Sequence, residues 1–216
     1  MKENFSDFEI TQLSLQRQEL NLKIDHYLKE HLSENPKYKN TKRLNLFEFQ
    51  GYSQNGEDGI IEEIFERIGV TNKFFVEIGA GFGLENNTTY LLLKDWQGLW
   101  VDANTQNTEF TRDKFSKLIR ECKLKVRNAT ITAENIEIIL SEEEMPQEID
   151  LLSIDIDGND YWVWKAINKY NPRVVVIEYN AFFKPPVKWV MKYNPHFNWD
   201  HNTMYFNSSL KSLEIL

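Results

Sequence analysis

The chain has 216 residues, 41% hydrophobic and 27% charged, which suffices for one α/β domain with a core plus a small additional segment. Its 33 acidic residues outnumber its 25 basic ones, and the net charge of −8 argues against nucleic acid or anionic lipid as a partner. The single cysteine, Cys122, excludes an internal disulfide, and the lack of a long apolar run predicts a cytoplasmic protein without a membrane span.

The first part of the chain differs in character from the rest. Residues 8–32 carry apolar residues at helical spacing among Gln, Glu and Lys, which predicts one or two amphipathic helices. We expect their apolar face to pack on the domain or to pair two copies of the chain as a homodimer. Asn35 to Lys42, with Pro36, is typical of a linker. The sequence thus predicts a helical extension and linker over residues 1–42 and a domain over residues 43–216.

From Glu57 onward, helix and strand patterns alternate. Such alternation predicts right-handed crossovers and a doubly wound parallel sheet, an α/β fold. Ligands of these sheets bind beyond the carboxyl ends of the strands, where functional residues are therefore expected. The predicted strands are Phe74–Ile78, Leu99–Val101, Leu124–Arg127, Leu151–Ile154 and Val174–Ile177. The predicted helices are Glu57–Ile68, Asn86–Lys94, Thr105–Glu121, one capped by Thr132 and running to Leu140, one from Asp160, and one within NSSLKSLEIL.

Three glycines follow the first predicted strand in FFVEIGAGFG: Gly79, Gly81 and Gly83. A buried strand followed by clustered glycines predicts a tight turn, because only Gly reaches positive φ without a Cβ clash. Leu84 occupies the position where a dinucleotide-binding fingerprint requires its third glycine, so the usual nicotinamide pattern is not met.

Two acidic residues at successive strand ends indicate which ligand this turn binds. Glu77 would repel a phosphate and attract an ammonium group. Asp102 ends the next strand, where a carboxylate accepts hydrogen bonds from the two ribose hydroxyls. A ligand that combines adenosine with a charged amino acid is S-adenosylmethionine, and the sequence predicts this cofactor.

Several stretches carry a family resemblance. VEIGAGFG, GLWVDAN, VRNATITAENI and LLSIDIDGNDYWVWKAI resemble the class I S-adenosylmethionine-dependent methyltransferases, which have a Rossmann-like sheet. YSQNGEDGIIEEIF, DIDGNDYWVW and VVVIEYN are similar to the FkbM-like small-molecule O-methyltransferases, many of which act on sugars or sugar nucleotides in surface-polysaccharide pathways. The resemblance covers about Tyr52 to Asn180. It implies methyl transfer to a hydroxyl of a small molecule, with a sugar or nucleotide sugar as the acceptor.

The resemblance also implies roles for single residues. Glu77, Gly79, Gly81 and Gly83 would surround the methionine part of the cofactor, Asp102 the ribose, and Asn128 with Ala129 the adenine, with Asp155 nearby and Gln54 closing over the ligand. For Gln54, the alternative is helix capping within the Ser53–Asp58 loop. Family members continue with a sixth and a seventh strand, whereas this sequence stops after a predicted helix. A shortened C-terminus, or a sheet edge closed in another way, is therefore expected.

O-methylation needs a general base or a metal, because an alcohol is a poor nucleophile at neutral pH. Oxygen ligands for Mg²⁺ or Mn²⁺ are available from Asp155, Asp157, Glu178 and Asn180, which follow two predicted strands. The alternative is that aspartates near Gly158 are turn and cap residues. In a metal-free mechanism, Asp155 would orient the acceptor and His201 or His196 would be the base.

The segment Phe182 to Phe206 is rich in aromatic residues and contains three prolines, which predicts an irregular lid over the acceptor. Aromatic packing over the core edge is the alternative. Two other functions stay open at this point. One is a non-catalytic S-adenosylmethionine-binding or scaffold protein, and the other is a nicotinamide-dependent oxidoreductase.

Overall fold

The computed structural model describes residues 19, 20, 22–24, 26, 27, 40–200 and 202–216, which form two compact units, residues 1–48 and 49–216. In the first unit, the described residues from 19 to 27 are helical, and the 3-10 helix η3 spans Leu44–Phe47. Most of the predicted amphipathic segment and linker lies outside the described residues. The predicted pairing of two chains through that segment therefore stays a prediction.

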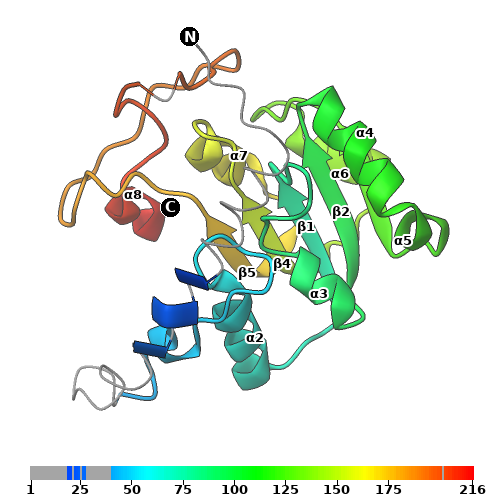
Figure 1. The fold of residues 1–216 in the computed structure, drawn as a ribbon. Helices are drawn as coiled ribbons and strands as arrows, with labels where there is room; N and C mark the ends of the chain where they lie inside the picture. Colours follow the sequence, from blue (N-terminus) through cyan, green and yellow to red (C-terminus); the bar gives the residue numbers. More distant parts are fainter. Residues whose placement is uncertain (1–18, 21, 25, 28–39, 201) are drawn as a thin grey trace, which may run out of the picture. The chain divides into compact units, whose positions relative to one another are not determined.

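The second unit contains a sheet of five parallel strands in the order β3-β2-β1-β4-β5 (Figure 1). The strands are β1 (Phe74–Ile78), β2 (Gln97–Asp102), β3 (Leu124–Asn128), β4 (Glu148–Ile154) and β5 (Asn171–Ile177). The chain runs outward from β1 to β3 and returns to the other side of β1, which creates a switch point between β1 and β4. This order confirms the predicted doubly wound α/β fold. Ile78 pairs with Val101 and with Ile154, so these neighbouring strands end at one edge.

Helices cover both faces of the sheet (Figure 1). One face packs on α2 (Glu57–Ile68), α3 (Thr89–Leu93) and α5 (Ser116–Arg120), and the other on α6 (Ile136–Glu142) and α7 (Asp160–Ala166). Helix α4 (Thr105–Lys114) follows β2, and α8 (Leu210–Ile215) comes last. Phe75 belongs to the first core and Val76 to the second, because successive side chains of a strand point to opposite faces. Both faces are thus occupied by core, and ligands are left with the strand ends.

The strands are longer than the sequence indicated. β2 begins at Gln97, β4 at Glu148 and β5 at Asn171, two to three residues before the predicted starts. The prediction followed the buried apolar residues, whereas backbone pairing continues past them, as between Glu148 and Asn171. Pro172 is tolerated because β5 is an edge strand of the described sheet.

Two helices differ from their predicted bounds. The helix predicted from Asn86 begins only at Thr89, because the residues before it turn their polar groups toward other parts of the unit. The single helix predicted over Thr105–Glu121 is interrupted at Phe115, whose ring packs edge-on against Trp100 at a centroid distance of 4.9 Å. Tertiary packing therefore sets this break, and the local sequence carries no helix breaker there.

The predicted cap at Thr132 is wrong. Helix α6 begins at Ile136 with Asn135 as its N-cap residue, and Thr132 contributes its backbone carbonyl, which accepts from both of their N–H groups. The last predicted helix is present as α8, where the Ser209 hydroxyl accepts from the Ser212 N–H as an N-cap.

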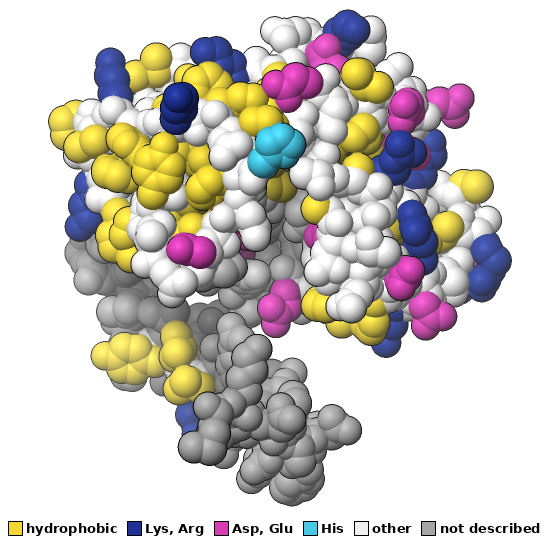
Figure 2. Space-filling view, turned by 90° about the horizontal axis from the view of Figure 1, so that it is seen from above, with side chains coloured by type: hydrophobic (Ala, Val, Ile, Leu, Met, Phe, Trp, Pro, Cys, Tyr) yellow, Lys and Arg dark blue, Asp and Glu magenta, His cyan; other side chains and the backbone are white. Residues whose placement is uncertain are grey.

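Between β5 and α8 the described residues are irregular, as predicted for Phe182 to Phe206. Its aromatic rings largely pack against one another, with Phe183 stacked on Trp189 at 4.3 Å and Trp199 stacked on Phe206 at 4.2 Å. Figure 2 shows exposed hydrophobic side chains gathered on one side of the face seen from above. The exposed large hydrophobic residues of the segment are Phe182, Val187, Met204 and Tyr205. None of the helices in the described part of the chain has both the length and the hydropathy of a membrane span.

Candidate functional site

A cleft of about 1030 Å³ opens where β1, β4 and β5 end. Its walls come from the glycine loop after β1, the start of α2, two side chains of α4, and the residues after β4 and β5. This is the switch-point edge of the sheet, where doubly wound folds bind their ligands. The cleft lies entirely within the second unit.

The glycine loop fits closely between its neighbours. Gly79 has φ +87°, and a Cβ at this position would lie 1.7 Å from the backbone carbonyl oxygen of Asp155. Its N–H donates to the carbonyl of Val101 at 2.8 Å. Gly81 also has positive φ, but a Cβ there would meet nothing within 4 Å. Gly79 thus holds the loop against the ends of both β2 and β4.

We expect Gly79→Ala to destabilise the chain by roughly 3 kcal/mol or more, from backbone strain and the displaced end of β4. Gly81→Ala is the matched control, because it carries the conformational cost alone, about 1 to 2 kcal/mol. Urea unfolding of both variants measures the difference. Equal losses in the two variants would show that the contact with Asp155 does not constrain the loop.

Glu77 is buried at the end of β1, with 2% of its surface exposed, and it forms part of the cleft wall. One carboxylate oxygen accepts from the Asn87 N–H at 2.9 Å and the other from the Thr88 hydroxyl at 2.5 Å. Burial outweighs these hydrogen bonds and raises the pKa of Glu77 to about 7, with a further contribution from the charge of Asp155. A cationic group in the cleft would stabilise the charged form.

Asp102 connects the end of β2 to the glycine loop. Its Oδ2 accepts from the Gly81 N–H at 2.8 Å, and its Oδ1 accepts from the Asn104 N–H at 2.8 Å and the Asn107 side chain at 3.2 Å. Asp102 itself does not line the cleft, but Asn107 and Phe110 of the adjacent helix α4 do. A carboxylate has about four lone-pair sites, so Asp102 can accept a further hydrogen bond from a ligand.

Asn128 ends β3 and Ala129 follows it, and neither residue lines the cleft; Gly83 does not line it either. The Asn128 amide instead donates to the carbonyls of Asp102 and Ala103. Exposed aromatic residues of the cleft wall are Phe82, Phe110 and Tyr179, and the rings of the first two meet edge-on at 5.4 Å. Sequence reasoning missed this pair, although an aromatic residue at 110 in an otherwise polar helix was a usable signal.

Gln54 lines the cleft, and the capping role expected as its alternative belongs to its neighbours. Asp58 Oδ2 accepts from the N–H groups of Gly51, Tyr52 and Ser53, while the Ser53 hydroxyl accepts from the Asp58 N–H. This reciprocal capping holds the loop before α2. Gln54 is thus left on the exposed side of the loop, facing the cleft.

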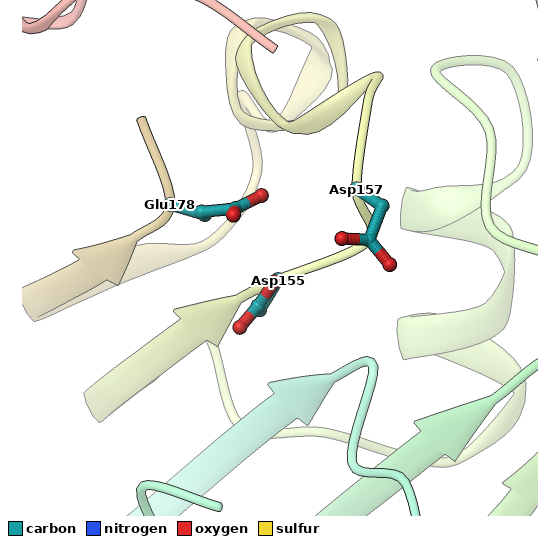
Figure 3. Close-up of side chains that lie close together, drawn as sticks. All are labelled: Asp155, Asp157 and Glu178. Carbon is teal, nitrogen blue, oxygen red and sulfur yellow. The ribbon is translucent and has the colours of Figure 1, made fainter. Parts of the chain in front are cut away.

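An acidic cluster of Asp155, Asp157 and Glu178 lies beyond β4 and β5, with one oxygen of each residue within 4.8 Å of the others. In Figure 3, Asp157 and Glu178 extend toward each other and Asp155 sits at the end of β4. Asp157 has φ +57°, so the predicted turn role holds for it alongside its place in the cluster. The sequence thus predicted three members of the cluster by their positions after strands.

Desolvation and neighbouring negative charges raise the pKa values of Asp155 and Glu178. Asp155 contacts solvent, yet surrounding protein displaces much of its hydration, and this desolvation with the charges of Asp157 and Glu57 raises its pKa to about 6. Desolvation, with the charges of Asp155 and Asp160, raises the pKa of Glu178 to about 8. The carboxylates therefore lack a positive partner among the described side chains of the cleft.

Two neighbours support the cluster without joining it. Asn207 Nδ2 donates to Glu178 Oε2 at 3.0 Å and so orients that side chain. Asp160 is buried and accepts from the N–H groups of Ile156 and Gly158, which fixes the loop after β4. Asn180, a predicted metal ligand, instead donates to the carbonyls of Met204 and Phe206 and accepts from the Phe182 N–H. The structure does not bring its side chain to the cluster.

Of the two candidate bases, the structure describes only His196. His196 is exposed, its backbone N–H donates to Asn194 Oδ1, and it is not part of the cleft wall. His201 lies outside the described residues.

Comparison with known proteins gives the following. No protein-family model matches the sequence, and no curated protein matches it. Among solved structures, an O-methyltransferase from Bacillus cereus in complex with SAH is 16% identical (67% of this chain, 68% of that one, TM-score 0.40). Precorrin-6y C5,15-methyltransferase from Geobacter metallireducens GS-15 is 14% identical, and the match covers 60% of this chain and 64% of that one with a TM-score of 0.40. The pyocyanin biosynthetic protein PhzM is 16% identical, and the match covers 74% of this chain and 45% of that one with a TM-score of 0.38. The chain thus spans less than two thirds of the latter two proteins.

At identities and TM-scores this low, the likeness carries no argument about function, which has to come from the cleft. The cleft combines a buried carboxylate beside a glycine loop, aromatic surface, and the Asp155 and Glu178 carboxylates of the acidic cluster. Such a site can hold a cationic amino acid group beside Glu77 and a divalent ion or another cation at the acidic cluster.

Proposed function

We propose that this chain is an S-adenosylmethionine-dependent methyltransferase that transfers a methyl group to a hydroxyl of a small molecule. The observation that carries the proposal is Glu77, a buried carboxylate in the cleft wall whose pKa is raised to about 7 by burial. The ammonium group of an amino acid supplies the positive charge that this carboxylate lacks, whereas a dinucleotide pyrophosphate would be repelled by it. Bound S-adenosylmethionine supplies a methyl group on a sulfonium.

The residues around Glu77 suit the rest of this cofactor. Gly81, with open space where a Cβ would stand, lets the backbone approach a ligand, and Asp102 lies behind the loop where a ribose would follow the amino acid end. The aromatic pair Phe82 and Phe110 offers an apolar surface for a base. We keep Asn128 and Ala129 as the proposed adenine edge by resemblance, with the aromatic pair as the alternative that the cleft walls support.

Titration calorimetry with S-adenosylhomocysteine and with NADH tests the cofactor assignment. Binding of the former and not of the latter supports the proposal. Preference for NADH would replace it with a nicotinamide-dependent oxidoreductase. Binding of S-adenosylhomocysteine without methyl transfer to any acceptor in the panel described below would favour a non-catalytic binding protein.

Asp102→Ala is expected to weaken S-adenosylhomocysteine binding by about 1.5 to 3 kcal/mol, because the ribose hydroxyls lose a charged acceptor. Asp113→Ala, on the exposed surface of α4, is the matched control and should bind like the wild type. Calorimetry on both variants, after thermal unfolding has shown that each is folded, measures the effect. Unchanged affinity in Asp102→Ala would remove Asp102 from the site.

We further propose that the acidic cluster binds Mg²⁺ or Mn²⁺. All three side chains supply hard anionic oxygens, and the pKa values of Asp155 and Glu178 are raised by desolvation first and by neighbouring negative charges second. When bound, a divalent ion supplies a Lewis acid that lowers the pKa of a hydroxyl beside it. The chain's own part is to hold the three carboxylates together through the turn at Asp157 and the Asn207 contact.

The acceptor we propose is a sugar of the kind found in surface polysaccharides. Among the described residues that line the cleft there is no Lys, Arg or His, while Glu57, Glu77, Glu85, Asp155 and Glu178 are all present. This wall favours an acceptor that presents uncharged hydroxyls, so between a free sugar and a sugar nucleotide it favours the former at the reacting end. Transfer of a radiolabelled methyl group to a panel of free sugars, glycosides and nucleotide sugars tests this preference among acceptors.

A further inference from the structure

One buried amide in the cleft wall has no partner. Asn86 lines the cleft with 6% of its surface exposed, and its Nδ2 makes no hydrogen bond. Its Oδ1 lies against the Thr89 hydroxyl, whose one proton it shares with the Gly83 carbonyl at 2.7 Å from the hydroxyl oxygen. A buried N–H donor without an acceptor costs folding free energy, so an orphaned donor in a cleft wall points to an acceptor that a ligand brings.

The position of Asn86 indicates which part of a ligand that is. The next residue, Asn87, donates its N–H to Glu77 Oε1, so Asn86 lies at the Glu77 end of the cleft. An amino acid group that places its ammonium at Glu77 carries its carboxylate one carbon away. That carboxylate needs donors, and the described cleft wall offers no Lys, Arg or His.

The other amides of the wall are less suitable. Asn87 Nδ2 donates to Ser153 and Asn107 Nδ2 to Asp102. Gln54 and Asn55 are exposed and belong to the loop before α2. Asn86 is the buried amide donor among the described lining residues that is left for a ligand.

We propose that Asn86 Nδ2 donates a hydrogen bond to the α-carboxylate of the amino acid end of the cofactor, and so selects ligands that carry this group. This inference rests on the proposed function. It makes Asn86 a binding and specificity residue and explains the orphaned donor as a group that is satisfied only in the complex.

The test compares two ligands on variants of one residue. Asn86→Asp keeps an oxygen to accept from Thr89 but replaces the donor with a negative charge. We expect the affinity for S-adenosylhomocysteine, measured by calorimetry, to fall roughly 10- to 100-fold. The affinity for 5′-methylthioadenosine, which lacks the amino acid group, should stay within about 3-fold of wild type. Asn168→Asp places the same charge on an exposed residue outside the cleft wall and should leave both affinities near wild type.

If the Asp variant does not fold, Asn86→Ala is measured with the same two ligands instead. It should also weaken the binding of S-adenosylhomocysteine alone. Equal loss for both ligands would show that Asn86 merely holds the loop and would overturn the inference, as would an unchanged affinity for S-adenosylhomocysteine. If the wild-type chain binds neither ligand, the proposed function fails and the inference falls with it.

Discussion

An Asp155→Asn variant is expected to bind S-adenosylhomocysteine like the wild type. Its rate of methyl transfer should fall by a factor of roughly 100 or more. The change removes one charge from the acidic cluster while conserving size, and it leaves the side chains of Glu77 and Asp102 intact. A Lewis acid contributes several kcal/mol to such a step, and each 1.4 kcal/mol is a factor of ten in rate. Radiolabelled transfer to the acceptor identified from the panel gives the rate, and calorimetry gives the affinities for Mn²⁺ and S-adenosylhomocysteine. Asp113→Asn is the matched control.

Chelation separates the metal mechanism from its alternative. EDTA should remove activity, and added Mg²⁺ or Mn²⁺ should restore it. A base-only mechanism predicts full activity in EDTA, loss of activity in His196→Ala or His201→Ala, and a rate that rises as the imidazole loses its proton. That set of results would overturn the metal mechanism and leave Asp155 as a residue that orients the acceptor.

The sequence predicted the fold where local pattern and tertiary structure agree. Helix α2 and strand β1 have their predicted bounds, because Gly69 ends one and a continuous buried run defines the other. The prediction failed where tertiary contacts decide. Phe115 interrupts a helix because its ring packs on Trp100, a contact that residue spacing along the chain cannot reveal.

The candidate site was predictable to the extent that it follows strand ends. Asp155 and Glu178 were found because parallel strands bring their carboxyl ends to one edge. Asn180 follows the same strand as Glu178, but its amide is taken up by the irregular segment, whose path no periodicity describes. Asn86 was predicted as the start of a helix, and only the three-dimensional contacts show that its amide lacks a partner.

Without added metal, we expect the thermal midpoint of the chain to fall as the pH rises from about 5 to about 8. Folding raises the pKa of Glu178 from 4.5 to about 8, and those of Glu77 and Asp160 to about 7, chiefly by desolvation. A carboxyl group with a raised pKa contributes its stability below the unfolded value and loses it as the pH rises through the folded value, because the folded state must give up a proton it holds more tightly. One pKa unit at a single buried group corresponds to about 1.4 kcal/mol, or roughly 3 to 5 °C in Tm for a domain of this size.

A buried carboxylate with a lowered pKa does not offset this fall of the thermal midpoint. Asp150 is buried at the start of β4 and, despite desolvation, its ion pair with Arg173 and hydrogen bonds from the N–H groups of residues 71–73 hold its pKa below the usual value. A depressed pKa contributes stability above the unfolded value, and that contribution is lost only as the pH falls through the folded value. The contribution of Asp150 is therefore constant over the window in which the raised groups lose theirs.

Mn²⁺ should reverse the slope that the acidic cluster produces, because it binds the ionised carboxylates and so stabilises the folded chain more at pH 8 than at pH 5. Glu178→Gln is the control that isolates this effect. Its amide oxygen can still accept from Asn207, but the variant has one charge fewer, so it should melt higher than the wild type at pH 8 without metal and gain less from Mn²⁺. Differential scanning fluorimetry from pH 5 to 8, with and without Mn²⁺, measures all four cases. A midpoint that does not change with pH would contradict the raised pKa values. A falling midpoint that Mn²⁺ does not restore would contradict the metal site and leave an ammonium-bearing ligand as the cation that this end of the cleft is built to receive.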